Sequence, residues 1–163
     1  MAGSISANTV PASPCASTTW SDTQIVCTTA SVQPPANGLA TFTITRSSDS
    51  HTSNTLNFQY APPTISSLSP ANGPSVGMRI AINGNNFGTT AFIKFNGQPV
   101  ATAVQSQTQL QFDVPAGLGT SNTVTVTVAG VTTAAANFAY DGPIISTLSP
   151  TNSPTPGGGT LVI

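Results

Sequence analysis

Charge is the property that this sequence most clearly lacks. Only 4% of the 163 residues are charged, namely three Lys or Arg and four Asp, and Glu is absent. Affinity for nucleic acid comes largely from basic residues that neutralise phosphates, so three scattered ones predict no nucleic-acid partner. Four scattered Asp residues likewise disfavour catalysis by a pair of carboxylates.

Membrane and targeting signals are also missing. No run of 18 apolar residues occurs, so no membrane span is predicted. The first ten residues, MAGSISANTV, lack the basic start and the apolar stretch of a secretory signal. We therefore expect either that a signal lay upstream and was removed, or that the chain is a piece of a longer protein. No Asn-x-Ser/Thr sequon is present, so N-glycosylation is not encoded.

Hydroxyl groups supply the polarity that charges do not. Ser and Thr fill 45 of the 163 positions. Thr suits the solvent faces of β-strands, and this is the simpler explanation of the composition. The alternative is an extracellular coat that is O-glycosylated or meets surface glycans, for which Trp20 could serve as a stacking platform.

An internal repeat organises the chain. TISSLSP at residues 64–70 returns 80 positions later as IISTLSP at residues 144–150. SDTQI at residues 21–25 returns 85 positions later as SQTQL at residues 106–110. The chain therefore holds the back of one unit, one whole unit and the front of a third. Half a unit is well below the size that supports a hydrophobic core by itself.

Alternation of apolar and polar residues predicts β-strands throughout. TVTVTV at residues 123–128 places three valines on one face, and TFTIT at residues 41–45 does the same for Phe42 and Ile44. Asn-Gly and other turn signals separate these runs, and no stretch has a helical period. Short strands spaced about 8 to 12 residues apart indicate an all-β, antiparallel sandwich.

The most specific motif opens the whole unit. PTISSLSPANGPSVGMRIAINGNNFG at residues 63–88, with F-x-Y at residues 138–140, resembles the IPT/TIG domain. This family occurs in plexins, some transcription factors and many extracellular repeat proteins, and the resemblance implies an immunoglobulin-like antiparallel β-sandwich. Function is much less constrained, because such domains serve in adhesion, scaffolding and carbohydrate-associated proteins alike.

The resemblance divides the chain into three parts. They are the C-terminal part of a split domain at residues 1–60, a complete domain at residues 61–142, and the N-terminal strands of a further domain at residues 143–163. With the offset of 85, Met1 falls opposite about position 86. At the other end, one extra turn residue changes the offset from 80 to 81, so Ile163 falls opposite Ile82. Two neighbouring copies would then sum to one domain that lacks only about three turn residues.

An incomplete sandwich exposes unpaired strand edges and an apolar groove, and such an edge recruits a strand. We therefore expect a structural subunit of an extracellular or cell-surface filament, in which each copy donates its C-terminal strands to the split domain of the next copy. A head-to-tail contact of this kind gives a helical polymer of one chain unless rotation closes a ring. The expected donor residues are Ile145, Leu148, Leu161 and Ile163, and the expected acceptor groove is lined by Ile25, Phe42, Ile44 and Phe58. The alternative is a fragment of a larger cell-surface multi-repeat adhesion or carbohydrate-associated binding protein.

The chain has two cysteines, Cys15 and Cys27. The offset of 85 sets them opposite Val100 and Phe112, an apolar pair of the complete unit. We predict a structural disulfide, which implies an oxidising compartment. Two cysteines without a nearby His are too few ligands for a zinc site.

Candidate catalytic groups are few. The single His, His51, lies among serines between two predicted strands, and a triad with Asp49 would need a pocket that hairpin loops seldom provide. A calcium ion held between domains by Asp141 stays open, although no Asp-x-Asp-x-Asp loop occurs. We predict no enzyme activity, no cofactor and no resident metal.

Overall fold

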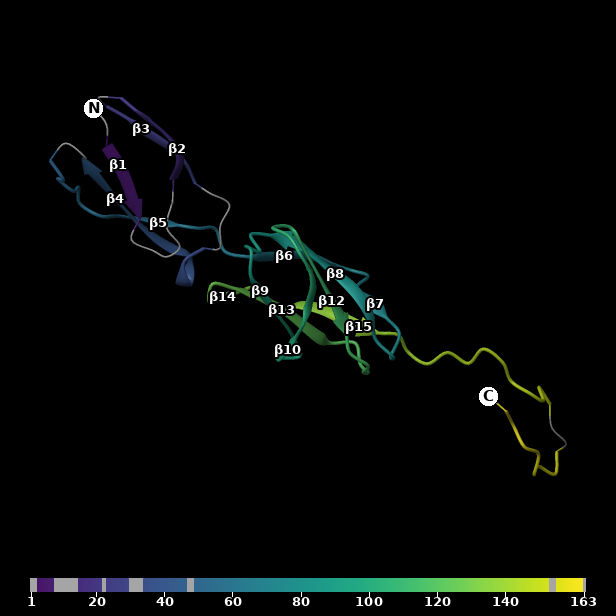
Figure 1. Cartoon of the computed structure of the whole chain (residues 1–163). Helices are drawn as coiled ribbons and strands as arrows, with labels where there is room; N and C mark the ends of the chain where they lie inside the picture. The colour runs from purple at the N-terminus through teal and green to yellow at the C-terminus, as the bar shows by residue number, and fades with distance from the viewer. Residues whose placement is uncertain are drawn as a thin grey trace.

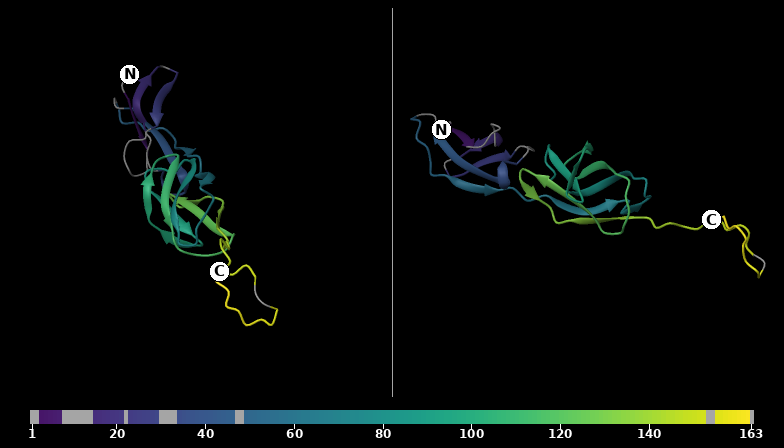
Figure 2. Two further views of the ribbon diagram at one scale, coloured as in Figure 1. Left: turned by 90° about the vertical axis from the view of Figure 1, so that its right-hand side faces the viewer. Right: turned by 90° about the horizontal axis from the view of Figure 1, so that it is seen from below.

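The computed structural model describes residues 3–7, 15–21, 23–29, 34–46, 49–152 and 155–162, and only the backbone of residues 3–7, 15–18, 20, 27–29 and 46. Three parts follow one another along the chain in Figure 1. We call them the N-terminal unit (residues 3–60), the complete unit (residues 63–140) and the C-terminal segment (residues 143–162). In all three views the C-terminal segment leads away from the complete unit (Figures 1 and 2).

Two β-sheets form the complete unit. One has the order β10-β9-β13-β15-β7, with β14 beside β13, and the other has the order β11-β12-β8-β6. The strands are β6 (Thr64–Ser69), β7 (Asn72–Gly73), β8 (Met78–Asn85), β9 (Ala91–Phe95), β10 (Gln98–Val100), β11 (Thr102–Gln105), β12 (Gln109–Val114), β13 (Asn122–Val128), β14 (Val131–Thr132) and β15 (Ala136–Tyr140). Their pairing is antiparallel apart from β15, which runs parallel to β7. The predicted all-β sandwich is confirmed.

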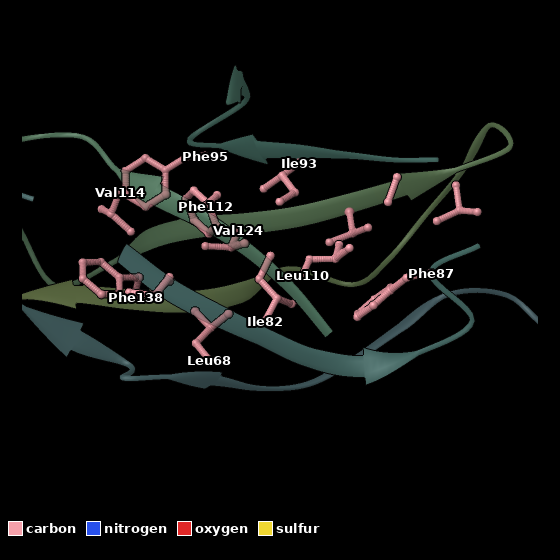
Figure 3. Packing of buried hydrophobic residues seen from close by; sticks show 14 of the residues in the cluster. Leu68, Ile82, Phe87, Ile93, Phe95, Leu110, Phe112, Val114, Val124 and Phe138 are labelled. Atoms are coloured by element: carbon pink, nitrogen blue, oxygen red, sulfur yellow. The ribbon is translucent and has the colours of Figure 1, made fainter. Parts of the chain in front are cut away.

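One hydrophobic cluster fills the space between the two sheets (Figure 3). The alternation in β13 buries Val124, Val126 and Val128, as the sequence predicts. β12 contributes Leu110 and Phe112 from the other sheet, and both are fully buried. Each large apolar side chain that is removed from water in this way stabilises the fold by about 1.5–3 kcal/mol.

The N-terminal unit repeats the back of this sandwich. Its elements are β1 (Gly3–Ala7), β2 (Cys15–Trp20), β3 (Ile25–Thr29), a short 3-10 turn η1 (Ala36–Gly38), β4 (Leu39–Arg46) and β5 (Leu56–Gln59). They form a sheet of order β1-β4-β5 and a hairpin of β2 and β3. The described part of residues 3–60 contains no counterpart of β6, β7 or β8.

Strand register shows which elements correspond. Phe42 pairs with Leu56 as Val124 pairs with Ala136 in the complete unit. On the other side of the same strand, Ala7 pairs with Phe42 as Phe95 pairs with Val124. β1, β4 and β5 therefore match β9, β13 and β15.

This register corrects the predicted seam between two copies. Since Ala7 matches Phe95, Met1 falls opposite Thr89 and not opposite position 86. The stretch without a counterpart is then residues 83–88, which is longer than the three turn residues expected. The offset of 85 holds at the SDTQI turn but not before it, because the N-terminal unit has three more residues between β1 and that turn. Loops accept such insertions far more readily than paired strands do.

The C-terminal segment contains the start of a hairpin like the one that β6 and β8 form in the complete unit. Ser149 and Val162 exchange two backbone hydrogen bonds, of 3.0 and 2.9 Å, in an antiparallel bridge. Their counterparts in the repeat, Ser69 and Ala81, pair in the same way between β6 and β8. The segment thus resembles the first strands of a further unit. Ile163, one of the predicted donor residues, lies outside the described residues.

Candidate interaction surfaces: an open sheet and an unpaired segment

The complete unit shows what front strands contribute to a sandwich. β8 pairs with β12 so that Ile82 lies opposite Leu110 and Ile80 opposite Phe112, while β6 adds Leu68 beside Ile82. Ile80 and Ile82 are 1% and 0% exposed. These strands therefore close the core and also occupy the hydrogen-bonding edge of β12.

The predicted acceptor groove lies where such strands would pack. Ile44 and Phe58 are 37% and 42% exposed, whereas their counterparts Val126 and Phe138 are fully buried. Phe42 is half-buried and lies edge-on to Phe58, with 5.8 Å between the ring centroids. The structure thus brings these three predicted residues together on β4 and β5.

Ile25 completes the predicted set from the other layer. It begins β3, as Leu110 falls near the start of β12, and it is half-buried where Leu110 is fully buried. Sequence reasoning left Leu56 and Tyr60 out of the groove, although both alternate with Phe58. Leu56 is 68% exposed, and the ring of Tyr60 lies edge-on to Phe58 with 5.1 Å between centroids.

Exposed apolar residues also mark the C-terminal segment. Leu148 and Leu161 are 42% and 53% exposed, whereas their repeat counterparts Leu68 and Ile80 are 9% and 1% exposed. The other predicted donor residue described, Ile145, is also exposed. The C-terminal segment and the sheet β1-β4-β5, which we call the open sheet, therefore expose the two halves of what is a single core in the complete unit.

A short joint connects the N-terminal unit to the complete unit. The backbone N–H of Asn37, in η1, donates to the carbonyl oxygen of Ala129 at 2.7 Å. The side-chain amide of Asn86 donates to the carbonyl oxygen of Pro62 at 3.0 Å, and Pro63 is buried. Hydrogen bonds thus hold the backbone on both sides of residues 61–62, which link the two units.

The polar groups that could do chemistry are solvated or satisfied locally. His51 Nδ1 lies 3.3 Å from Asp49 Oδ2 with four fifths of the His side chain exposed. The nearby Ser53 hydroxyl donates to the carbonyl of Asn54 and accepts from the N–H of Ile44, so it does not face the imidazole.

The described residues contain neither a cluster of metal-binding side chains nor a helix that could span a membrane. Among the described residues there is no group of three His, Cys, Asp or Glu side chains that could hold a metal ion. Asp141, the residue considered for calcium, accepts a 2.8 Å hydrogen bond from the amide of Asn72. No helix in the described part of the chain is long and apolar enough to cross a membrane.

Two charged residues form the clearest ion pair. Arg79 Nε and Nη2 donate to the two carboxylate oxygens of Asp113, each at 2.8 Å, between β8 and β12. This hydrogen bonding lowers the pKa of Asp113 and raises that of Arg79. Both side chains are more than half exposed, so the pair adds little stability.

Cys15 and Cys27, the residues of the predicted disulfide, lie in the hairpin of β2 and β3. The register of β2 and β3 sets Cys15 opposite Thr29 and Cys27 opposite Thr18, which places the cysteines on neighbouring strands. Their side chains lie outside the described residues, as does that of Trp20. The disulfide stays a prediction, and the choice between a packing role and a stacking role for Trp20 stays open.

Together, the two-sheet packing and the repeated register define an immunoglobulin-like β-sandwich repeat protein. A family model described as the IPT/TIG domain matches residues 6–60 and 63–140. The chain belongs to the IPT/TIG family, which confirms the resemblance seen in the sequence. No curated protein matches the chain.

Several solved structures are similar to parts of the chain. An auxiliary nutrient binding protein from Bacteroides thetaiotaomicron is 25% identical over 50% of this chain and 21% of its own, with a TM-score of 0.43. The plexin A4 extracellular region is 19% identical over 66% of this chain and 12% of its own, with a TM-score of 0.47. The protein SGBP-B from a xyloglucan utilization locus in Bacteroides uniformis is 20% identical over 71% of this chain and 32% of its own, with a TM-score of 0.40. The chain thus spans less than a third of each of these proteins.

Proposed function

We propose that the chain is a non-enzymatic segment of an extracellular or cell-surface protein built from IPT/TIG repeats, with a structural or adhesive role. Its two incomplete units are completed by strands of further repeats. One observation carries this proposal: residues that are exposed in the incomplete units have counterparts that are buried in the complete unit. Phe58 against Phe138 is the clearest pair, at 42% and 0% exposed.

The energetics favour completion. Burying a large apolar side chain stabilises a fold by about 1.5–3 kcal/mol, and the open sheet offers at least Ile44, Leu56 and Phe58 for burial. A new strand would also pair with the edge of β3, as β8 pairs with β12. Few charges are present to oppose the approach of a second apolar surface.

The surface of the complete unit fits an extracellular role without chemistry of its own. Thr123, Thr125 and Thr127 alternate with the buried valines of β13, so hydroxyl groups and not charges face outward there. Such a surface suits contact with uncharged surface glycans, and we include these among the proposed partners.

Extending the chain tests the proposal. A copy of residues 63–88 is joined before residue 1 through a flexible linker, and unfolding of the N-terminal unit is followed by the fluorescence of Trp20, the single tryptophan. We expect a cooperative transition at clearly higher temperature than in the unextended chain. The matched control carries Leu68→Asp and Ile80→Asp in the added copy alone, and it should give no gain. An added front half that leaves the Trp20 transition unchanged would contradict the proposal.

A second candidate function is the head-to-tail filament of identical chains. The hairpin register of the C-terminal segment favours it, because Ser149 and Val162 already pair as Ser69 and Ala81 do. Negative-stain microscopy of the purified 163-residue chain would then reveal filaments that persist in high salt, since charge takes little part. Leu148→Asp with Leu161→Asp should abolish them. A compact monomer at all concentrations would exclude this candidate while leaving the multi-repeat proposal standing.

A further inference from the structure

One aromatic ring of the complete unit lies outside the hydrophobic core. Six aromatic residues occur at positions 63–140, and five of them are at most 5% exposed. The sixth, Phe92, is 65% exposed. It alternates along β9 with Ala91 and Ile93, which are buried, so its side chain points to the outer face of the sheet. A single exposed apolar side chain needs no explanation by itself, so the surroundings of Phe92 decide whether it has a role.

A hollow of about 490 Å³ adjoins this ring. Its lining includes Phe92 and Lys94 of β9, Pro99 of β10 and Thr127 of β13, three strands that are neighbours in one sheet (Figure 1). Strand register sets Thr127 opposite Phe92 and Pro99 opposite Lys94. Pockets for small ligands have volumes of about 300–1,000 Å³, and the hollow falls within that range.

A cation without a partner lies beside the ring. Lys94 is the only lysine of the chain, it is exposed, and it shares the outer face with Phe92 because the two are two residues apart on one strand. The described carboxylates have other partners, and these carboxylates belong to Asp49, Asp113 and Asp141. Among the described residues Lys94 thus has no carboxylate partner, so its ammonium group is available to an anion from outside the chain.

Hydroxyl groups complete the lining of the hollow. Thr127 Oγ1 lies 2.8 Å from Thr132 Oγ1, and one of the two donates to the other. Each hydroxyl can donate one hydrogen bond and accept two, so this pair retains capacity for a ligand. Thr102, at the start of β11, adds another hydroxyl. The hollow therefore combines an aromatic ring, hydroxyl groups and one cation.

These groups match a sugar ring better than a peptide. The C–H groups on the face of a sugar ring are weakly positive and pack on the electron-rich face of an aromatic ring, while its hydroxyl edge suits threonine. A peptide strand would need a free backbone edge. The edge strand here, β10, has only three residues and includes Pro99, which has no N–H to donate.

We infer that the hollow beside Phe92 and Lys94 binds an acidic glycan. A sugar ring stacks on Phe92, and the carboxylate of a uronic acid pairs with Lys94. This inference rests on the proposed contact with surface glycans and adds a charged sugar to it. It does not depend on completion of the incomplete units, because every residue that lines the hollow belongs to the complete unit.

Calorimetric titration of the full chain tests the inference with two matched ligands. They are an oligosaccharide of galacturonic acid and its methyl ester, which has the same sugar rings without the charges. The variants are Phe92→Ala, Phe92→Tyr and Lys94→Gln. Two controls lie outside the hollow: Leu118→Ala removes an apolar side chain that is 81% exposed, and Arg79→Gln removes one positive charge from the other sheet.

We expect the acid to bind about five-fold more tightly than the ester at low ionic strength, which is the most that an exposed ion pair contributes. Lys94→Gln should remove this preference, and so should added salt. Phe92→Ala should weaken the binding of both ligands on the order of ten-fold, because the stacking face is lost. Phe92→Tyr and the two controls should bind as the unchanged chain does.

Each other result counts against the inference. Equal binding of acid and ester would overturn the pairing with Lys94 and leave the proposed contact with uncharged glycans standing. Binding that Phe92→Ala does not weaken, or no binding of either ligand, would overturn the site. Competition by tri-glutamate would place an acidic peptide in the hollow instead of a glycan. None of these results bears on completion of the incomplete units, which thermal unfolding of the extended chain tests separately.

Discussion

Two matched substitutions compare a closed hydrophobic core, in the complete unit, with an open one, in the C-terminal segment. Ile80→Ala removes a side chain that is 1% exposed in the complete unit, and Leu161→Ala removes its repeat counterpart, which is 53% exposed. Ile80 lies in β8, and Leu161 directly precedes Val162, which bridges to Ser149 as Ala81 pairs with Ser69. The difference between the two losses of stability measures how much more tightly Ile80 is packed than Leu161.

The expected magnitudes follow from this exposure. Truncating a fully buried Ile to Ala costs about 2–5 kcal/mol, because contacts are lost and a cavity remains. In a domain of this size, about 4–8 °C of melting temperature corresponds to each kcal/mol, so Ile80→Ala should lower the midpoint of the transition by roughly 10–40 °C. Leu161→Ala should change stability by less than about 0.5 kcal/mol, as surface substitutions do.

Differential scanning calorimetry of the full chain at two protein concentrations gives the readout. A loss from Leu161→Ala as large as that from Ile80→Ala in dilute solution would refute the reasoning, because the C-terminal segment would then be buried within its own chain. A loss that emerges only at high concentration would instead place the segment against a second copy and favour the filament.

Three further changes probe the complete unit. Gly84→Ala should destabilise it by about 1–3 kcal/mol, because the new Cβ would lie 2.0 Å from a carbonyl oxygen of β6, while Gly142→Ala, with open space around it, should have no such effect in thermal unfolding. Burial raises the pKa of Tyr140 above its ordinary value, so its contribution to stability should be fully present below the unfolded pKa and be lost as pH rises through the folded pKa; Y140F should remove this alkaline decline. Arg79 lowers the pKa of Asp113, so a small stabilisation should be present above the unfolded pKa and disappear as pH falls below about 4, and D113N should flatten that part of the pH–stability curve.

The strands were predictable because their pattern follows directly from which side chains need burial. Val124, Val126 and Val128 alternate with threonines, and their burial agrees with that pattern. Phe42, Ile44 and Phe58 follow the same rule, so the sequence also located most of the open groove. Periodicity is local information, and a single chain contains enough of it to set the face of each strand.

Loop lengths and short edge strands were not predictable in the same way. The offset of 85 came from the turn around Ser21 and was extended to Met1 across a loop whose length differs between the units. Only the pairing of Ala7 with Phe42 reveals the longer gap, and pairing is non-local information. The full burial of Phe87 was hidden for the same reason, because it depends on strands far away in the sequence. β7, only two residues long, carries no alternation that could identify it.

The pairing of β7 with β15 has a mechanical consequence. β7, near the start of the unit, lies parallel there to β15, its last strand, and the two are joined by hydrogen bonds from the N–H of Ala139 to the carbonyl of Ala71 at 3.0 Å and from the N–H of Asp141 to that of Gly73 at 2.7 Å. Tension applied through the two ends of the unit pulls these strands past each other, so the bonds stretch together in shear and do not open one at a time. A row of such units would transmit a pulling force along its length before any one of them began to unravel.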